Sequence, residues 1–183
     1  MTSQITDTFL FKGDEYSLIA MKGGNLATPE QFGMEASSYS TACYRGYFAT
    51  YELINNLLFL REFALHEKDN NYLTIDGIIP NKKSNSDDLN YRIRCYKNLN
   101  LKILFTGKIR LAKDFIKEFY VHMGYQKATA FKTVLDFTLQ GGQMIKVINR
   151  SLEMRRRRGE FKKRYESRDV YIDEAFNMDM DLV

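Results

Sequence analysis

The feature that most constrains the fold is a pair of apolar segments joined by a two-residue turn. Residues 44–53 and 57–65 carry aromatic and aliphatic side chains on both faces, which favours β-strands covered on both sides. Asn55 and Asn56 lie between the two segments, and asparagine tolerates the positive φ angles that such a turn requires. The pattern predicts an antiparallel hairpin.

A second hairpin is predicted further along the chain. Apolar residues alternate from Phe131 to Leu139, Gly141-Gly142 supplies turn residues, and residues 144–148 return as a strand. A shorter hairpin is predicted at the start of the chain, where residues 9–12 and 16–21 flank a turn.

The remaining segments are shorter. Residues 91–96 and 101–111 are typical of strands, the latter interrupted by Gly107, and residues 72–75 can extend the first hairpin. Residues 113–121 fit a short helix or a strand equally well. Thr28, Pro29 and Gln31 form a capping signal for one helical turn, which Gly33 ends. We expect the polar residues 81–90 to be the most mobile internal loop.

These elements predict a mainly β fold, or an α+β one. The hairpins would build a sandwich or a strongly curved antiparallel sheet with one or two short helices and a C-terminal basic helix. A chain of 183 residues suits one domain with an appendage. We expect a β-rich core domain over 1–149, a basic helix over 150–168, and an acidic, partly apolar tail over 169–183.

Charge is concentrated at the C-terminal end. Residues 150–168 hold nine basic and three acidic side chains, whereas residues 169–183 hold five acidic side chains and no Lys or Arg. Ser151 provides an N-cap for a helix. The basic side chains that we expect to bind a partner are Arg155, Arg156, Arg157, Arg158, Lys162, Lys163 and Arg164.

This basic helix allows several interpretations. It can attract an acidic protein surface. It can neutralise nucleic-acid phosphates, with Phe161 and Tyr165 stacking on bases. It can also be a solvated helix, or be neutralised by the neighbouring acidic tail. The tail favours a protein partner, because its carboxylates would repel phosphates at close range.

Catalytic and metal-binding patterns are sparse. Cys43 and His122 are the candidates for a nucleophile and its base, with Arg45 and Arg110 as cations that could stabilise a thiolate. A buried structural cysteine is the simpler interpretation. Neither His66 nor His122 has a partner at metal-ligand spacing, and no phosphate-binding glycine loop is present, so we expect no metal and no cofactor.

A Gly-Tyr pair occurs twice, at 46–47 and 124–125. The polar or amphipathic residues within and next to these pairs form a candidate binding groove. They are Arg45, Tyr47, His122 and Tyr125. The alternative is structural, with the arginine and the tyrosines holding two hairpins together.

Three motifs carry a resemblance to a known family. They are Cys-Tyr-Arg-Gly-Tyr at 43–47, Phe-Thr-Gly at 105–107 and Tyr-Val-His-Met-Gly-Tyr at 120–125. In order and spacing they resemble a family of small bacterial proteins that brings no assigned activity. The chain departs from the family pattern at Tyr44 and Tyr51, where tryptophan is usual. The resemblance implies a bacterial, cytosolic protein.

The two cysteines, Cys43 and Cys95, form no spaced motif, and we expect them to be free thiols in a reducing compartment. We find no apolar segment long enough to span a membrane and no secretory signal, so we expect a cytoplasmic protein. Our leading hypothesis is a non-enzymatic bacterial module that binds a protein partner, of the toxin-neutralising or phage-defence accessory type. A nucleic-acid-binding protein is the alternative, and a small Cys/His enzyme is the third.

Overall fold

Most of the chain forms β-strands. The computed structural model describes residues 2–82, 93–164 and 176–180, with the side chains of Lys82 and residues 159–164 outside that description. The strands are β1 (Thr8–Phe11), β2 (Asp14–Gly23), β3 (Tyr47–Ile54), β4 (Leu57–Leu65), β5 (Asn81–Lys82), β6 (Arg94–Tyr96), β7 (Leu101–Lys102), β8 (Gly107–Phe115), β9 (Phe131–Gln140) and β10 (Gln143–Asn149). The helices are the short 3-10 helices η1 (Pro29–Phe32), η3 (Lys117–Phe119) and η4 (Ala128–Ala130), and the α-helix α1 (Ser151–Arg164).

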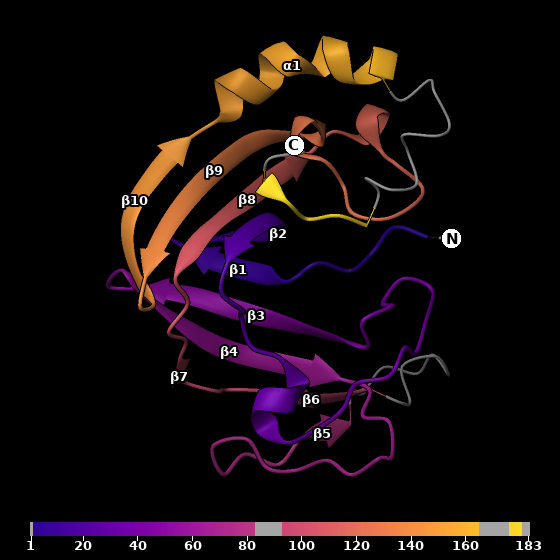
Figure 1. Cartoon of the computed structure of the whole chain (residues 1–183), viewed down its shortest axis with the longest axis vertical. Coiled ribbons are helices and arrows are strands. Elements are labelled where there is room, and N and C mark those ends of the chain that lie inside the picture. Colours follow the sequence, from indigo (N-terminus) through magenta and orange to yellow (C-terminus); the bar gives the residue numbers. More distant parts are fainter. Residues whose placement is uncertain (1, 83–92, 165–175, 181–183) are drawn as a thin grey trace.

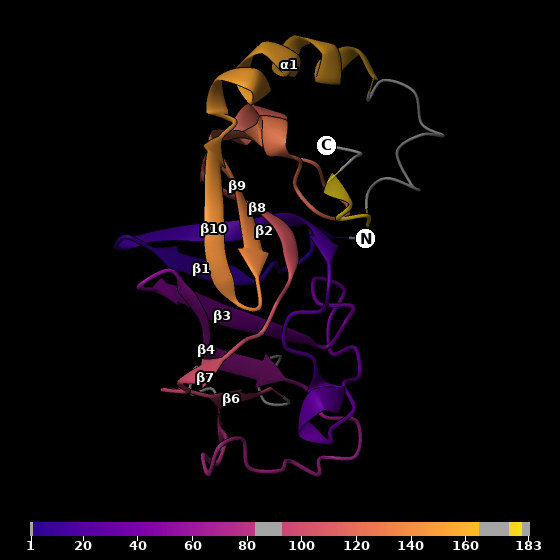
Figure 2. The same ribbon diagram turned by 60° about the vertical axis from the view of Figure 1, so that its left-hand side comes forward.

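Seven of the described strands close into a barrel (Figures 1 and 2), in the order β10-β9-β8-β2-β1-β3-β4. The sheet closes where Gln143 of β10 lies opposite Leu57 of β4. Two backbone hydrogen bonds flank this contact, from Leu58 N to Gly142 O at 2.9 Å and from Met144 N to Asn56 O at 2.7 Å. The predicted mainly β fold is therefore confirmed, and its strongly curved sheet is closed at the tips of the two long hairpins.

Register shifts explain part of the curvature. The additional residue is Ile19 in β2, Arg61 in β4 opposite Thr50 and Tyr51, and Ile145 in β10. An extra residue in one strand bends it and increases its twist. Among the pairs that close the barrel, β1 and β3 run parallel. The strands β6 and β7 both pair with β4, and β5 pairs with β6, which extends the sheet beyond the barrel at the end away from α1 (Figure 1).

The barrel is filled by large apolar side chains. Phe9 and Tyr51 stack with ring centroids 4.8 Å apart, and the Tyr51 hydroxyl accepts a hydrogen bond from Ala27 N at 3.0 Å. A buried tyrosine needs such a partner for its polar atom. Among the fully buried members of this core are Phe9, Leu18, Tyr51, Leu58, Leu60, Phe63, Phe105, Ile109, Leu111 and Phe137.

Helix α1 follows β10 directly and packs outside the barrel (Figures 1 and 2). Its start is tied to β9, because Arg150 N donates to Val134 O at 2.8 Å and Val134 N donates to Ser151 Oγ at 3.0 Å. Met154 is fully buried in a second cluster with Ile19, Ala112, Ala128, Ala130, Phe131 and Val134. The first part of the helix therefore packs against β9 and η4 rather than projecting into solvent.

The turn predictions agree with the structure. Asn55 and Asn56 have φ of 49° and 65°, and Gly141 and Gly142 have φ of 55° and 80°, as two-residue hairpins require. The helical turn at η1 has its capping box, and Gly33 ends it with φ of 72°. The segment from 113 to 121 is divided between the end of β8 and η3.

The prediction of a strand at residues 72–75 is wrong. Only Ile75 forms a bridge there, with Ile78, because the chain turns at Asp76 and Gly77, both at positive φ. The predicted mobile loop over 81–90 falls mostly outside the described residues, apart from β5 at its start.

The two adjacent glycines of the β9–β10 turn differ in their surroundings. A Cβ on Gly142 would lie 2.2 Å from Ile103 O, whereas a Cβ on Gly141 would meet nothing within 4 Å. We expect Gly141→Ala to lower the free energy of unfolding by about 1 kcal/mol through its left-handed backbone alone. Gly142→Ala adds a clash where the barrel closes and should lower it by roughly 2–4 kcal/mol. Urea denaturation of both variants tests this, and equal losses would contradict the closure described here.

Candidate functional site

The position of α1 depends on the buried carboxylate of Asp136. The Arg110 guanidinium donates to both of its oxygens, Nε to Oδ1 at 2.6 Å and Nη2 to Oδ2 at 3.0 Å. Arg150 Nε donates to Oδ2 at 3.1 Å, and Arg150 Nη1 donates to Glu153 at 2.9 Å. The hydrogen bond to Asp136 raises the pKa of Arg150. One carboxylate thus joins β8, β9 and the start of α1.

A second anchor lies one helical turn beyond Met154. Arg158 Nε donates to Thr129 O at 2.9 Å, and its Nη2 donates to Phe131 O at 2.6 Å. These two carbonyls belong to η4 and the start of β9. The guanidinium of Arg158 is therefore held in one orientation against the barrel.

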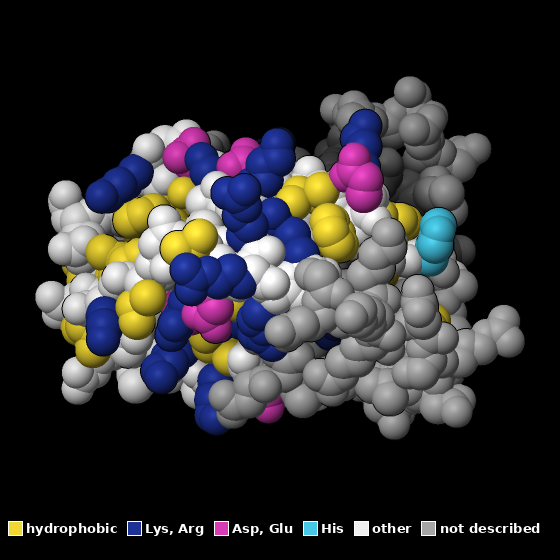
Figure 3. Space-filling model, turned by 90° about the horizontal axis from the view of Figure 1, so that it is seen from above, with side chains coloured by type: hydrophobic (Ala, Val, Ile, Leu, Met, Phe, Trp, Pro, Cys, Tyr) yellow, Lys and Arg dark blue, Asp and Glu magenta, His cyan; other side chains and the backbone are white. Residues whose placement is uncertain are grey.

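Basic side chains gather where α1 meets β9. We define the basic face by Lys132, Arg155 and Arg158, because the four consecutive arginines of α1 point in different directions around the helix and only Arg155 and Arg158 of them face β9. Lys132, Arg155 and Arg156 are exposed, and Arg157 and Arg158 are half-buried. Figure 3 looks onto this end of the molecule and shows more Lys and Arg than Asp and Glu side chains there.

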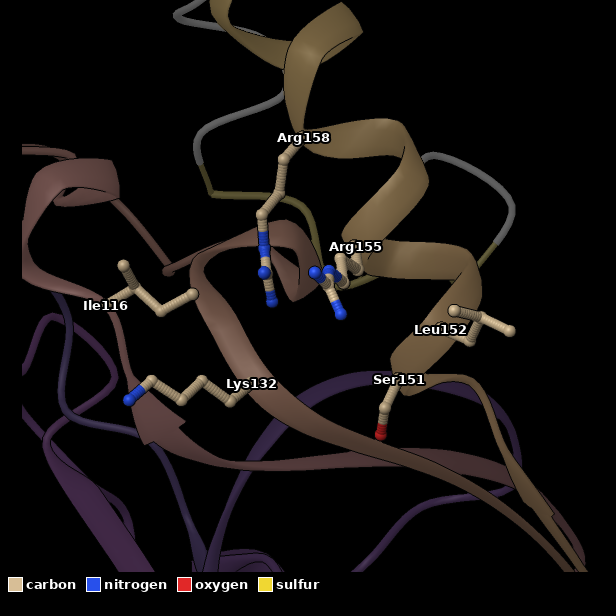
Figure 4. Close-up of a pocket in the computed structure, with 6 residues that line it drawn as sticks. All are labelled: Ile116, Lys132, Ser151, Leu152, Arg155 and Arg158. Atoms are coloured by element: carbon tan, nitrogen blue, oxygen red, sulfur yellow. The ribbon is translucent and has the colours of Figure 1, made fainter.

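A cavity of about 550 Å³ opens between α1 and the barrel (Figure 4). We call it the helix cavity, and its lining residues are Ile116, Lys132, Ser151, Leu152, Arg155 and Arg158. Arg155 and Arg158 extend from the helix toward the strand that carries Lys132 (Figure 4). Three of the lining residues are cationic and none is acidic, while Ile116 and Leu152 supply aliphatic surface. This chemistry suits an anionic group that has an apolar neighbour.

A neighbouring cavity of about 400 Å³ lies on the other side of the β10–α1 junction. Its lining residues are Lys22, Gly107, Lys108, Arg110, Asp136, Arg150 and Met180. Met180 belongs to the described part of the acidic tail, which runs beside β2: Met21 N donates to Met178 O at 2.8 Å, and Met178 packs on the main core. The described part of the tail therefore docks on β2.

The predicted basic residues fall into two groups. The structure places Arg155, Arg156, Arg157 and Arg158 on the described part of α1, whereas the side chains of Lys162, Lys163 and Arg164 lie outside the description. Sequence reasoning missed Lys132, Ile116 and Asp136. Asp136 lies 26 residues from Arg110 along the chain, and no local sequence pattern predicts an ion pair between residues so far apart.

The predicted groove residues are only partly brought together. The Arg45 guanidinium binds both oxygens of Asp7 and lies 4.7 Å from the Tyr47 ring centroid. Burial lowers the pKa of Arg45, but the charge of Asp7 more than offsets this, so the pKa is raised overall; Tyr125 also contributes from nearby. His122 is exposed instead and packs edge-on against Tyr120, with centroids 5.0 Å apart.

Asp7 gives this cluster a structural role. The carboxylate is 3% exposed and accepts a hydrogen bond from Ala49 N at 2.8 Å, which ties the residue before β1 to β3. Gly46 lies beside it with φ of 75°, and a Cβ there would lie 2.3 Å from Ser37 O. The cluster around Asp7 therefore joins distant segments of the barrel wall. An acid immediately before an apolar strand was the only sequence signal for Asp7.

Cys43 is not presented to solvent. It is 1% exposed, its Sγ lies 3.6 Å from Tyr47 O as a hydrogen-bond donor, and burial raises its pKa. Arg110, considered as a cation near this thiol, binds Asp136 instead. Within the described residues, no group of three or more His, Cys, Asp or Glu side chains is arranged to hold a metal ion.

Comparisons with protein-family models, with curated proteins and with solved structures found no match. The resemblance to a bacterial family stays a prediction. No helix among the described residues has both the length and the apolar character needed to cross a membrane.

Cys43 provides a direct test of the enzymatic alternative. Because burial raises its pKa, the thiolate fraction at neutral pH is smaller than that of an ordinary cysteine. We expect iodoacetamide to label Cys43 no faster than the buried Cys95 in the folded protein, and both to react readily in urea. Mass spectrometry of peptides after timed quenching measures the two rates. Rapid labelling of Cys43 alone in the folded state would restore it as a candidate nucleophile.

Proposed function

We propose that this chain is a non-enzymatic interaction module of the bacterial cytoplasm whose basic face binds an acidic surface of a protein partner. The observation that carries the proposal is the helix cavity, where Lys132, Arg155 and Arg158 surround an opening with no acidic lining residue. We place the module with toxin-neutralising or phage-defence accessory proteins, on the basis of its small size, its charged C-terminal end and its lack of an assembled catalytic constellation among the described residues.

The docking of α1 supports this proposal energetically. A free arginine-rich helix would lose conformational freedom on binding, and that loss weakens association. Here Met154, Arg150 and Arg158 already hold the described part of the helix on the barrel. The exposed cations Arg155 and Lys132 are thus presented from fixed backbone positions, where they increase the association rate with an acidic surface.

Nucleic-acid binding is the second candidate, favoured by the gathering of Lys and Arg side chains in Figure 3. Phosphate neutralisation needs only such a surface. A binder of single strands usually adds aromatic side chains on which bases stack. The lining of the helix cavity holds no aromatic residue, and its apolar part is aliphatic. The cavity therefore favours a protein partner.

The experiment compares two labelled probes of equal formal charge, an oligoglutamate peptide and a single-stranded DNA, by fluorescence anisotropy across salt concentrations. Full-length protein should bind the peptide more tightly than the DNA. The double variant Lys132→Gln/Arg155→Gln should weaken peptide binding by about tenfold, which equals 1.4 kcal/mol.

The matched control removes two exposed lysines at the opposite end of the molecule, Lys97→Gln/Lys102→Gln, and should change binding by less than about twofold. Tighter binding of the DNA, with a steep salt dependence, would replace the proposal by the second candidate. If both double variants lost the same peptide affinity, binding would depend on the net charge of the protein and not on the basic face.

A further inference from the structure

The residues that line the helix cavity are of two chemical kinds. Arg155, Arg158 and Lys132 supply positive charge, while Ile116 and Leu152 supply aliphatic surface. Leu152 is 59% exposed, so its side chain is accessible to a partner. The cavity has a volume of about 550 Å³ and is open to solvent, so a side chain of a partner protein can enter it.

We propose that the helix cavity is a specificity pocket for an acidic side chain that stands next to an aliphatic one in the partner protein. The inference rests on the proposed function and narrows it, because it replaces a diffuse attraction between surfaces by a local recognition element. The element is a Glu or Asp beside a Leu, Ile or Val in an extended or helical segment.

The cationic residues of the cavity are organised for a carboxylate. Two hydrogen bonds to main-chain carbonyls fix the Arg158 guanidinium. Arg155 extends from the same helix, and its guanidinium lies beside that of Arg158, whereas Lys132 lines the opening from β9 with its ammonium group directed away from them (Figure 4). A carboxylate between the two guanidinium groups gains charge-assisted hydrogen bonds. An aliphatic side chain covering the opening would reduce access of water and strengthen those bonds.

The two aliphatic residues, which lie at opposite ends of the opening (Figure 4), select among anions. Ile116 and Leu152 present branched hydrocarbon surface, which gains free energy by burying another hydrocarbon side chain. A phosphate group and its sugar offer little such surface. A peptide that carries charge alone would use only the cationic residues of the cavity. Charge and apolar surface together therefore distinguish one class of segment from other polyanions.

Adjacent arginines on α1 provide the decisive comparison. Arg155 and Arg156 are both exposed and carry the same charge, but only Arg155 lines the cavity. The probes are two labelled peptides of equal charge, one in which Glu alternates with Leu and one of Glu and Ser. Binding to the full chain is measured by anisotropy.

We expect the Glu-Leu peptide to bind about tenfold more tightly than the Glu-Ser peptide. Arg155→Gln should weaken the Glu-Leu peptide by about tenfold and Arg156→Gln by less than about twofold. Leu152→Ser, at an exposed position, should abolish the preference between the two peptides while leaving the Glu-Ser affinity within about twofold.

Equal effects of the two arginine variants, or equal affinities of the two peptides for the unaltered protein, would overturn the specificity pocket and leave the proposed function standing. No binding of either peptide at low salt would instead remove the proposed function itself. Tighter binding of a single-stranded DNA of the same charge than of the Glu-Leu peptide would overturn both.

Discussion

The position of the basic helix depends on the ion pairs of the Asp136 carboxylate. This carboxylate lies 8% exposed between the guanidinium groups of Arg110 and Arg150, and so it connects two barrel strands to the residue that begins the basic helix. Breaking a buried ion pair by removing one partner costs about 3–5 kcal/mol, because the remaining charge is left uncompensated. An arginine-rich segment as short as α1 is only marginally helical when isolated. Its helical structure and its location therefore both follow from docking.

A second buried carboxylate bound by an arginine lies elsewhere in the barrel. Asp7 binds Arg45 and the Ala49 amide, and so it holds the beginning of β1 to β3 where these two strands run parallel. In both clusters an ion pair between a buried aspartate and an arginine connects segments that are distant in sequence. Arginine in this chain thus has two roles. Arg45 and Arg110 stabilise the fold from within, whereas Arg155 and Arg156 are exposed to solvent, and we propose that Arg155 contributes to partner binding.

Local patterns predicted the elements well. The Asn55-Asn56 and Gly141-Gly142 turns and the helix start at Ser151 are each set by residues close in sequence, and the structure has all three. A short apolar segment was a weaker signal: residues 72–75 fit a strand, but the positive φ at Asp76 and Gly77 turns the chain back instead.

The assembly of the elements was beyond sequence reasoning. Closure depends on a single opposed pair of residues, Gln143 and Leu57, far apart along the chain. The candidate site shows the same limit. The arginine run of α1 was evident, but Lys132 and Ile116, which complete the cavity, belong to segments with no unusual composition. A run of charged residues is visible in the sequence, whereas the concave surface beside it arises only from packing.

We propose that binding takes place between α1 and β9. Backbone amide shifts of the isotope-labelled full chain, followed by NMR during titration with an acidic, aliphatic-rich peptide, locate the binding surface. We expect the largest shift changes at Lys132, Leu152 and Arg155, with little change around Asp7. Changes centred on the Asp7 cluster or on β6 and β7, with α1 unaffected, would contradict this proposal.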